Sequence, residues 1–394
     1  MRVTSADLYD VDLLSQGIWL HPVILRLKTD EGIDGIGEVA LAYGSGHSAG
    51  LNMARELVER YVLGADPMRV ETMWHTLFRS TFWAQGGGPV VYGAMSAIDE
   101  ALLDIKARAL GMPVYELLGG KVTDRIRLYG NGWSNIRLPD GSPRCNSPES
   151  YAEAARQVVA DGYDALKFDP FYIRPDGVQA HPERYLSKEM CDLSYARVAA
   201  VREAVGPDVD ILVEVHGSLG TTSAIEMGRR LAELKPFFYE EPVDAMNVEA
   251  MLKVAQNVPI PIAAGERLYT RYGFREYIES QAVDVLQPDL GLAGGLTEVK
   301  KIAACAETYD LHVQPHHCAS PVSTAASVQL DACITNFVIQ EWRPYWEPPI
   351  MELVEEPLDT QAVNGYLTVP DRPGLGVTLN EDAIRRYPCM HLSE

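Results

Sequence analysis

The sequence predicts a protein of the α/β class whose larger part is a closed barrel of parallel strands. Past about residue 123, helical periodicity and short apolar strands alternate along the chain. Eight such strands can be counted, and eight alternating units are typical of a parallel barrel. The chain has 394 residues, which is long for one average domain but suits one barrel with a smaller additional domain.

The first 122 residues have the pattern of a small α+β domain. Apolar residues alternate at 23–27 and 35–39, on either side of a turn at 29–32, which predicts a hairpin-like start. Helical periodicity follows at 49–62 and 90–110. Gly111 and Pro113 follow the second run, as expected for a helix end.

The barrel is predicted at 123–345. Its expected strands lie at 126–129, 165–169, 211–216, 237–240, 262–266, 283–289, 311–316 and 337–341. The tail at 346–394 is rich in proline and glutamate and cannot be another unit of the repeat. We expect it to return to the first domain.

The charge balance excludes a class of partners. Lys and Arg number 34 and Asp and Glu 55, a net charge of −21, so the surface repels nucleic acid and anionic lipid. The six cysteines lie far apart without a CxxC pair, and the first residues have no apolar signal-peptide core. These features predict a cytoplasmic protein with no nucleic-acid or membrane partner.

A polar or ionisable side chain stands where each predicted strand from the second to the eighth ends. These residues are Lys167, Glu214, Glu240, Glu266, Asp289, His316 and Glu341. From Glu214 onward they follow one another at 23 to 27 residues, which is one strand-and-helix unit. We therefore expect all of them at one mouth of the barrel, the face where enzymes of this architecture place their chemistry.

Three of these residues are carboxylates on successive strands. Glu214, Glu240 and Glu266 form an oxygen-rich set that suits a hard divalent cation such as Mg²⁺. Without a cation, their repulsion in a partly buried mouth would raise their pKa values. Each alone could be a solvated acid or a helix N-cap, but three at one-unit spacing favour a metal site.

Several motifs carry a family resemblance. They are the run 97–106 leading into Leu117-Leu118-Gly119-Gly120, Lys167-Phe168-Asp169-Pro170-Phe171, Glu240-Glu241-Pro242, Ala264-Gly265-Glu266-Arg267, Gln287-Pro288-Asp289-Leu290, Gly294-Gly295 and Pro315-His316. The chain resembles the enolase superfamily, and within it the mandelate racemase-like sugar-acid dehydratases of the gluconate and galactonate type. The resemblance covers essentially the whole chain.

The resemblance implies a modified (β/α)7β barrel with an N-terminal capping domain that the C-terminal tail completes. It implies one Mg²⁺ held by Glu214, Glu240 and Glu266, and abstraction of the proton α to a carboxylate through an enediolate. Lys167 can supply a positive charge on the same rim, and Glu341 fits as a hydrogen-bond donor to the enediolate if its pKa is raised. A homo-oligomer is also implied, with octamers as the family's habit.

The bases decide which reaction is expected. Racemases of the family carry Lys-x-Lys on the second strand, but the second lysine is Asp169 here. The resemblance to the dehydratases implies instead that Asp289 orients His316, that His316 removes the C2 proton of an aldonate, and that His216 protonates the departing C3 hydroxyl. The predicted product is a 2-keto-3-deoxy sugar acid, which makes the protein a carbon–oxygen lyase.

Alternatives remain at this stage. A racemase, epimerase or cycloisomerase could use the same scaffold, and a non-catalytic relative could act as a binding protein. His317 competes with His316 as the base, although the Pro-His match favours His316. Glu240 is preferred to Glu241 as a ligand, with Glu241 turned outward before Pro242.

Six further residues are candidates for binding the sugar acid. Loops of the capping domain should cover the mouth, because the reaction needs a lid that excludes water. Trp19 and Tyr43 are the candidates from these loops, with Phe82 and Trp83 as additional aromatic residues, all with ordinary packing as the alternative. Asn131, Asp169, Arg267 and Trp342 are the candidates in the barrel wall.

Overall fold

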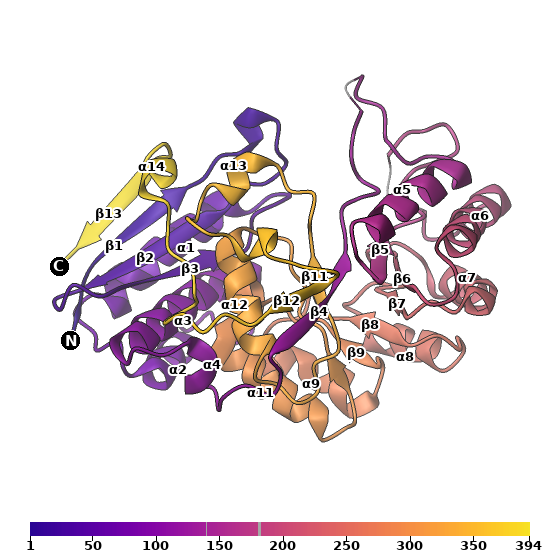
Figure 1. Cartoon of the computed structure of the whole chain (residues 1–394). Helices are drawn as coiled ribbons and strands as arrows, with labels where there is room; N and C mark the ends of the chain where they lie inside the picture. Colours follow the sequence, from indigo (N-terminus) through magenta and orange to yellow (C-terminus); the bar gives the residue numbers. More distant parts are fainter. Residues whose placement is uncertain (139, 180–182) are drawn as a thin grey trace.

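A computed structural model describes residues 1–138, 140–179 and 183–394 of the chain (Figure 1). An antiparallel sheet with helices forms one part, and a parallel sheet surrounded by helices forms the other. The predicted fold class, a barrel with an α+β capping domain, is confirmed. No helix of the described residues is long and apolar enough to cross a membrane.

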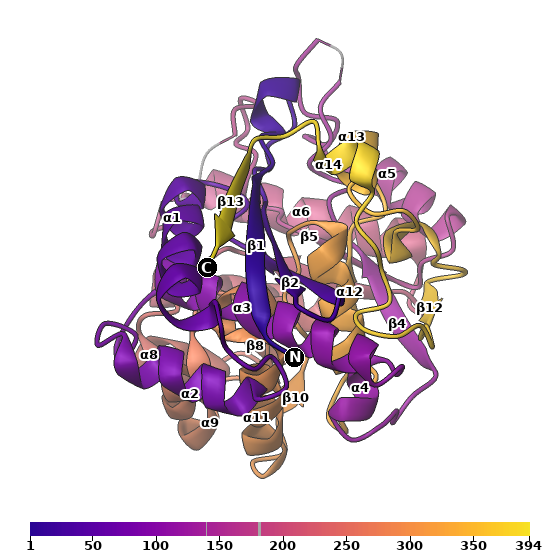
Figure 2. The ribbon, with the colours of Figure 1, turned by 90° about the vertical axis from the view of Figure 1, so that its left-hand side faces the viewer.

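The sheet of the capping domain has four strands in the order β13-β1-β2-β3. Their bounds are β1 Val3–Asp10, β2 Val23–Thr29, β3 Asp34–Val39 and β13 Cys389–Ser393. β2 and β3 form the expected hairpin, and β13 pairs antiparallel with β1 beside it (Figure 2). The last strand of the chain therefore completes the sheet that the first strand begins.

Helices cover one face of this sheet. α1 His47–Leu57, which continues into a π-helical turn at Val58–Val62, and α3 Pro89–Ala109 pack on the strands, whereas α2 Val70–Ser80 and α4 Val114–Leu117 pack on α3. α3 is buried along most of its length and packs closely on β3. This approach requires glycine at position 37, because a Cβ there would collide with the backbone of Ala97.

Eight parallel strands of the described chain form the barrel. Their bounds are β4 Arg125–Gly130, β5 Ala165–Phe168, β6 Asp210–Glu214, β7 Phe238–Glu240, β8 Ile262–Ala264, β9 Val285–Leu286, β10 His312–Val313 and β11 Gln340–Trp342. β11 pairs with β4 at Glu341 and Tyr129, and a bridge joins Val313 to Phe337, so the sheet closes on itself. Each strand lies where the apolar runs predict one.

Helices connect successive strands of the barrel. They are α5 Pro148–Ala160, α6 Lys188–Val205, α7 Thr221–Leu231, α8 Val248–Ala255, α9 Thr270–Ser280, α10 Leu290–Ala293, α11 Gly295–Glu307 and α12 Pro321–Asp331. After β11 the chain leaves the barrel through α13 Pro348–Met351, so seven strand–helix units are followed by an eighth strand. This is the (β/α)7β arrangement.

The tail contacts both parts of the molecule. β12 Tyr366–Thr368 pairs antiparallel with β4, an addition to the barrel that the sequence did not suggest. α14 Glu381–Ile384 then leads to β13 in the capping domain. The tail therefore joins the two parts as well as completing the cap sheet.

Buried polar contacts dock the capping domain on the barrel. Glu38 of β3 accepts hydrogen bonds from the backbone N–H and hydroxyl of Ser320, which caps α12. Asp99 of α3 accepts from the backbone N–H of Thr297 in the first turn of α11, at 2.9 Å. Carboxylates are favourable at helix N-termini. These contacts hold the cap against the segments that carry Asp289 and His316.

Candidate active site

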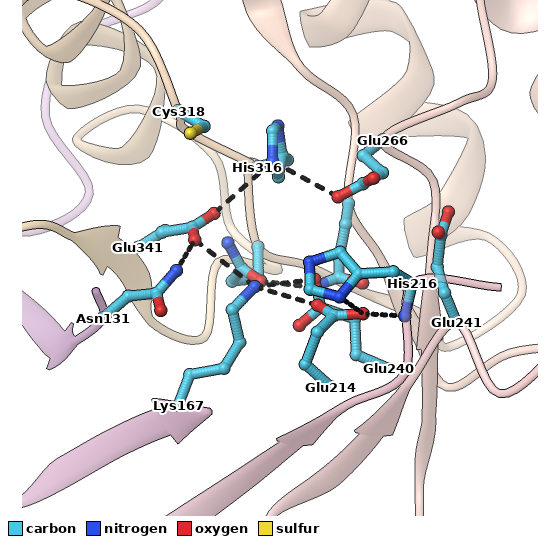
Figure 3. Close-up of polar contacts among 12 residues, drawn as sticks. Asn131, Lys167, Glu214, His216, Glu240, Glu241, Glu266, His316, Cys318 and Glu341 are labelled. Atoms are coloured by element: carbon cyan, nitrogen blue, oxygen red, sulfur yellow. Dashed lines mark hydrogen bonds and ion pairs between the residues drawn. The ribbon is translucent and has the colours of Figure 1, made fainter. Parts of the chain in front are cut away.

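Three carboxylates meet at the mouth of the barrel, two of them buried and the third, that of Glu266, partly buried. Glu214 ends β6, Glu240 ends β7, and Glu266 follows β8 by two residues. Each offers a carboxylate oxygen, and these oxygens all lie within 4.8 Å of one another (Figure 3). Glu240 Oε2 is buried and takes part in no hydrogen bond within the described chain, and the buried Glu214 Oε2 makes no hydrogen bond there but lies 3.3 Å from Lys167 Nζ. Three hard oxygen donors, one of them with an unsatisfied buried atom, fit a divalent cation such as Mg²⁺.

The pKa values of two of the three carboxylates are raised, as their mutual repulsion predicts, and that of the third is lowered. Burial and the charge of Glu214 raise the pKa of Glu240 well above its ordinary value. The pKa of Glu266 is also raised, chiefly by burial. Glu214 differs: burial alone would raise its pKa, but His216 and Lys167 outweigh burial and lower it. The predicted rise in pKa is therefore seen for Glu240 and Glu266 but not for Glu214.

Lys167 of β5 supplies a positive charge directly beside these carboxylates. Its Nζ lies 2.7 Å from Glu240 Oε1 and 3.3 Å from both Glu214 Oε2 and Glu341 Oε1. Burial lowers the pKa of Lys167, but the surrounding carboxylates, Glu240 foremost, raise it well above its ordinary value. The ammonium group therefore stays charged within the mouth.

His316 is held by a carboxylate on each side. Its Nδ1 lies 2.7 Å from Asp289 Oδ2, and its Nε2 lies 3.2 Å from Glu266 Oε2. Burial lowers the pKa of His316, but the neighbouring carboxylates, Glu266 foremost, raise it to about 9. Because Asp289 holds Nδ1, the ring presents Nε2 to the carboxylate cluster.

The side chain of His317 lies apart from this cluster. Its Nε2 is 2.9 Å from the hydroxyl of Thr324, which donates in turn to Asp359. Burial lowers the pKa of His317 to about 3, so the ring is neutral. Of the two neighbouring histidines, His316 has the position that favours proton transfer at the mouth.

His216 occupies the other side of the cluster. Its Nδ1 lies 2.8 Å from Asp169 Oδ2, and its backbone has a positive φ of 54°, which is unusual for a residue with a side chain. Partial burial lowers the pKa of His216, but Glu214 and Asp169 raise it to about 10. Strained backbone of this kind persists where the surroundings hold a functional side chain in place.

Asp169 has a different neighbour from the one expected. It was predicted to contact the sugar acid, but its Oδ2 faces His216 and its Oδ1 accepts a hydrogen bond from the backbone N–H of Phe171 at 2.7 Å. Asp169 is buried. Both of its carboxylate oxygens are thus engaged within the protein, which favours a role in positioning His216.

Glu341 of β11 is linked to several neighbours at once. Asn131 donates to its Oε1 at 2.5 Å, and the backbone N–H of His317 donates to its Oε2 at 2.9 Å. Burial alone would raise the pKa of Glu341. The charges of Lys167 and His316 have the larger effect and lower this pKa to about 2. The expectation of a raised pKa was therefore wrong, because the nearby cations outweigh burial. An ionised carboxylate accepts hydrogen bonds and cannot donate one.

Glu241 does not turn outward. It has a positive φ of 39° and is fully buried, and its side chain forms an ion pair with Arg267 apart from the three-carboxylate cluster (Figure 3). Arg267 also lies 3.0 Å from Glu266 Oε1. The predicted wall residue Arg267 thus neutralises two acids at the edge of the mouth.

The two loops of the capping domain that were predicted to cover the mouth contact each other. The Trp19 and Tyr43 rings contact each other edge to face at 5.7 Å. The His21 and His47 rings, from the same two loops, stack at 3.8 Å. Burial and the charge of Glu266 raise the pKa of Tyr43 well above its ordinary value, so its hydroxyl keeps its proton.

The remaining aromatic candidates lie elsewhere. Trp342 is 1% exposed and belongs to the hydrophobic core, because alternation along β11 points it to the opposite face from Glu341. Its burial does not favour the predicted contact with the substrate. Phe82 and Trp83 are more than 70% exposed and pack edge to face on each other.

Arg343 and Trp346 also contact Trp19, although neither was predicted as a site residue. The Arg343 guanidinium lies 5.0 Å from the Trp19 ring centroid and 4.6 Å from that of Trp346. Arg343 also donates to the sulfur of Cys318, which lies close to His316 and Glu341 (Figure 3). One signal was available in the sequence: Arg343 follows Glu341 by two residues and therefore falls on the same side of the strand's continuation.

Comparisons with known proteins identify the family. Residues 20–119 match the N-terminal domain of the mandelate racemase/muconate lactonizing enzyme family, and residues 150–383 match the family described as Enolase C-terminal domain-like. The chain belongs to the enolase superfamily. The expected membership in its mandelate racemase/muconate lactonizing enzyme group is confirmed.

Two curated relatives in this superfamily are similar over most of the chain. D-galactonate dehydratase of Xanthomonas oryzae pv. oryzae is 36% identical over 93% of the chain and 90% of its own length. D-gluconate dehydratase of Thermoproteus tenax is 37% identical over 83% of the chain, a match that spans 62% of the relative's own length. The predicted class of carbon–oxygen lyase agrees with both names.

Solved structures in the enolase superfamily show the same fold. A member of the superfamily from Salmonella Typhimurium is 42% identical, with a TM-score of 0.94 over the whole of both chains. A mandelate racemase/muconate lactonizing enzyme-like protein from a Roseovarius species is 34% identical, with a TM-score of 0.88 over 98% of the chain and 96% of that structure.

Proposed function

We propose that this enolase-superfamily protein dehydrates a sugar acid, an aldonate such as D-gluconate or D-galactonate, to a 2-keto-3-deoxy acid. The observation that carries the proposal is a pair of histidines, each held by an aspartate through Nδ1, beside one cluster of three carboxylates. Two separately oriented proton-transfer groups suit a reaction that removes one proton and delivers another. The names of the two relatives support the same class of substrate.

Glu214, Glu240 and Glu266 would hold a divalent cation, which we propose to be Mg²⁺. When bound, the cation supplies positive charge that favours ionisation next to the substrate carboxylate. Lys167 contributes a fixed charge at the same mouth, since it lies within 3.3 Å of two of these carboxylates. Arg267 limits the negative potential at the edge by pairing with Glu241 and Glu266.

His316 is proposed as the base in its neutral form; the charge of Glu266, which does most among the carboxylates to raise the pKa of His316, would be offset when a cation is bound. Asp289 accepts a hydrogen bond from Nδ1–H, which leaves the Nε2 lone pair as the proton acceptor, and its charge stabilises the imidazolium that forms. The C2–H bond breaks, its proton goes to Nε2, and its electron pair passes to the substrate carboxylate to form the enediolate.

His216 is proposed as the acid. Asp169 holds its Nδ1, so Nε2 is the ring nitrogen that can donate a proton to the C3 hydroxyl. The C3–O bond then breaks, the hydroxyl leaves as water, and the electron pair of the enediolate forms the C2–C3 double bond. The resulting enol becomes the 2-keto-3-deoxy acid on proton transfer to C3.

Glu341 is proposed to organise the mouth rather than to donate a hydrogen bond. As an anion it binds Lys167 and accepts from Asn131. Trp19 and Tyr43, with Arg343, are proposed to cover the substrate and exclude water.

The proposal is tested with the variants His316→Asn and His216→Asn and a panel of aldonates in the presence of Mg²⁺. Keto-acid formation should fall by about 10²- to 10⁴-fold in both variants, the usual contribution of a general acid or base. Exchange of the C2 hydrogen with solvent deuterium should be lost in His316→Asn and retained in His216→Asn. Wild-type product formation in either variant would refute the assignment.

The same experiment separates the alternative activities. Deuterium at C2 with inversion of configuration and no loss of water would favour a racemase or epimerase. Binding of Mg²⁺ without turnover of any aldonate would favour a non-catalytic relative.

A further inference from the structure

A cavity of about 590 Å³ lies where helices of the capping domain meet the barrel helix α11. We call it the seam cavity. Its lining residues are Met68, Arg69, Val70, Glu71, Thr72, Leu103, Lys106, Leu117, Leu118, Thr297, Lys300 and Lys301. None of them belongs to the candidate active site, and α3 packs against each of α2, α4 and α11.

The seam cavity is basic in a strongly acidic protein. The capping domain contributes Arg69 and Lys106 to it, and α11 contributes Lys300 and Lys301. Lys300 Nζ donates a hydrogen bond to the backbone carbonyl of Cys333 at 2.5 Å. Among its described lining residues Glu71 is the single carboxylate, and Glu71 Oε2 is already paired with Lys301 Nζ at 2.7 Å. With 34 basic against 55 acidic residues in the chain, four cations around one cavity are a marked local reversal of charge.

Several donors in the seam cavity have no acceptor. Within the part of the chain that the structure describes, the side chains of Arg69 and Lys106 make no hydrogen bond or ion pair. α2 begins at this point with Arg69 as its N-cap residue and no side-chain cap, and the residues of its first turn, Val70, Glu71 and Thr72, are among the lining. Uncapped N–H groups and the helix dipole attract an anion, and nearby cations strengthen the attraction.

The cavity also has an apolar side. Leu103, Leu117 and Leu118 also line it, and Leu103 is 5% exposed. A ligand with a strongly charged head and a small organic body would use both kinds of surface.

We propose that the seam cavity binds a phosphate-bearing small anion that joins the capping domain to the barrel. A phosphate dianion suits the site better than a carboxylate, because it has more acceptor oxygens for the spare donors and a larger charge for the four cations. Two of the cations lie on each side of the seam, so the bound anion holds Arg69 and Lys106 toward Lys300 and Lys301. α11 follows Asp289 through the short helix α10, so the occupied seam also steadies the segment that carries the residue holding His316.

The proposal is tested by calorimetric titration of the full chain with inorganic phosphate and, separately, with a phosphorylated aldonate. The test variant is Arg69→Gln/Lys106→Gln, and the matched control is Lys253→Gln, an exposed lysine of α8 outside the cavity. We expect saturable binding by the wild type and the control, weakened about tenfold or more in the double variant, since charge-assisted hydrogen bonds are lost. Tighter binding of the phosphorylated aldonate would show that the organic body is also recognised; equal binding would assign the site to phosphate itself.

Two outcomes overturn the proposal: the absence of saturable binding by the wild type, or equal binding by the double variant and the control. The single variant Lys106→Gln replaces the double variant if the latter does not fold. Titration of His316→Asn separates this site from the candidate active site, since unchanged affinity supports the seam cavity and lost binding refutes it. The readout is binding and not turnover, so its failure leaves the proposed dehydration untouched.

Discussion

His216 Nδ1 lies 2.8 Å from Asp169 Oδ2. The arrangement repeats that of His316 and Asp289, which are 2.7 Å apart on the opposite side of the three carboxylates. Each aspartate binds the ring nitrogen that faces away from the chemistry, which fixes the tautomer and the orientation of its histidine. The mouth therefore holds two similar aspartate–histidine pairs with separate neighbours.

The first prediction distinguishes the roles of the two aspartate–histidine pairs in the reaction. Asp169→Asn should lower kcat for dehydration by about 10²-fold, because His216 loses the negative charge that orients its ring and keeps the ring protonated. KM should change little, since both oxygens of Asp169 are engaged within the protein. Exchange of the C2 hydrogen with deuterium, followed by NMR, should persist in this variant.

Asp289→Asn is the matched comparison. This variant should lose both dehydration and exchange of the C2 hydrogen, because the substitution removes the charge that orients His316, the proposed base. If Asp169→Asn instead raised KM and left kcat unchanged, Asp169 would be a substrate-binding residue, as the sequence had suggested.

The second prediction concerns the cation. Glu240 and Glu266 have raised pKa values because burial and neighbouring acids disfavour their charges, so a bound cation should stabilise the fold. Adding Mg²⁺ to chelator-treated protein at about a hundred times its Kd should stabilise it by about 2.7 kcal/mol, seen as a higher Tm. The gain should shrink in Glu266→Gln and persist in Glu276→Gln, an exposed control on α9. An equal Tm with and without Mg²⁺ would exclude a site at this cluster.

The repeat pattern made the barrel and the strand-end residues predictable from sequence. Each unit of strand and helix returns the chain to the same mouth, so Glu214, Glu240 and Glu266 could be grouped from their spacing. β12 could not be found in this way, because three residues are too few to show alternation. Its pairing with β4 depends on the path of the whole tail.

Neighbours across strands were harder to predict than positions along them. Alternation puts Asp169 on the same face as Lys167, but it does not reveal that Asp169 meets His216 from the next strand. The pKa of Glu341 likewise depends on its 3.3 Å distance from Lys167, which no spacing in the sequence contains. The position of Trp342, in contrast, could have been predicted from the sequence. Trp342 follows Glu341 directly, so alternation along the strand points its side chain away from the mouth.

The third prediction is a dependence of stability on pH that does not involve the mouth. Burial raises the pKa of Glu38 to about 7, although hydrogen bonds from Ser320 oppose the shift. Between these two pKa values the folded state therefore retains a proton that the unfolded chain has already lost. The contribution of Glu38 to the free energy of unfolding is complete below the unfolded pKa of about 4.5 and is lost as the pH rises to about 7. The loss amounts to about 3 kcal/mol.

Denaturant unfolding at a series of pH values checks this prediction. The free energy of unfolding of the wild type should fall between pH 5 and pH 7 relative to Glu38→Gln, which cannot titrate. Glu276→Gln should follow the wild type. Parallel pH profiles for all three proteins would contradict the raised pKa.

The last prediction contrasts two tryptophans that were expected to act alike. Trp342 is fully buried in the core, so Trp342→Phe should lower the free energy of unfolding by about 2 kcal/mol and leave KM unchanged. Trp19 is 43% exposed and contacts Tyr43 and Arg343 in the cover, so Trp19→Ala should change stability little and lower kcat/KM for the aldonate. Denaturant unfolding and steady-state kinetics on both variants measure the contrast. A raised KM in Trp342→Phe with unchanged stability would return Trp342 to the substrate-binding residues and would require the wall of the mouth to extend behind β11.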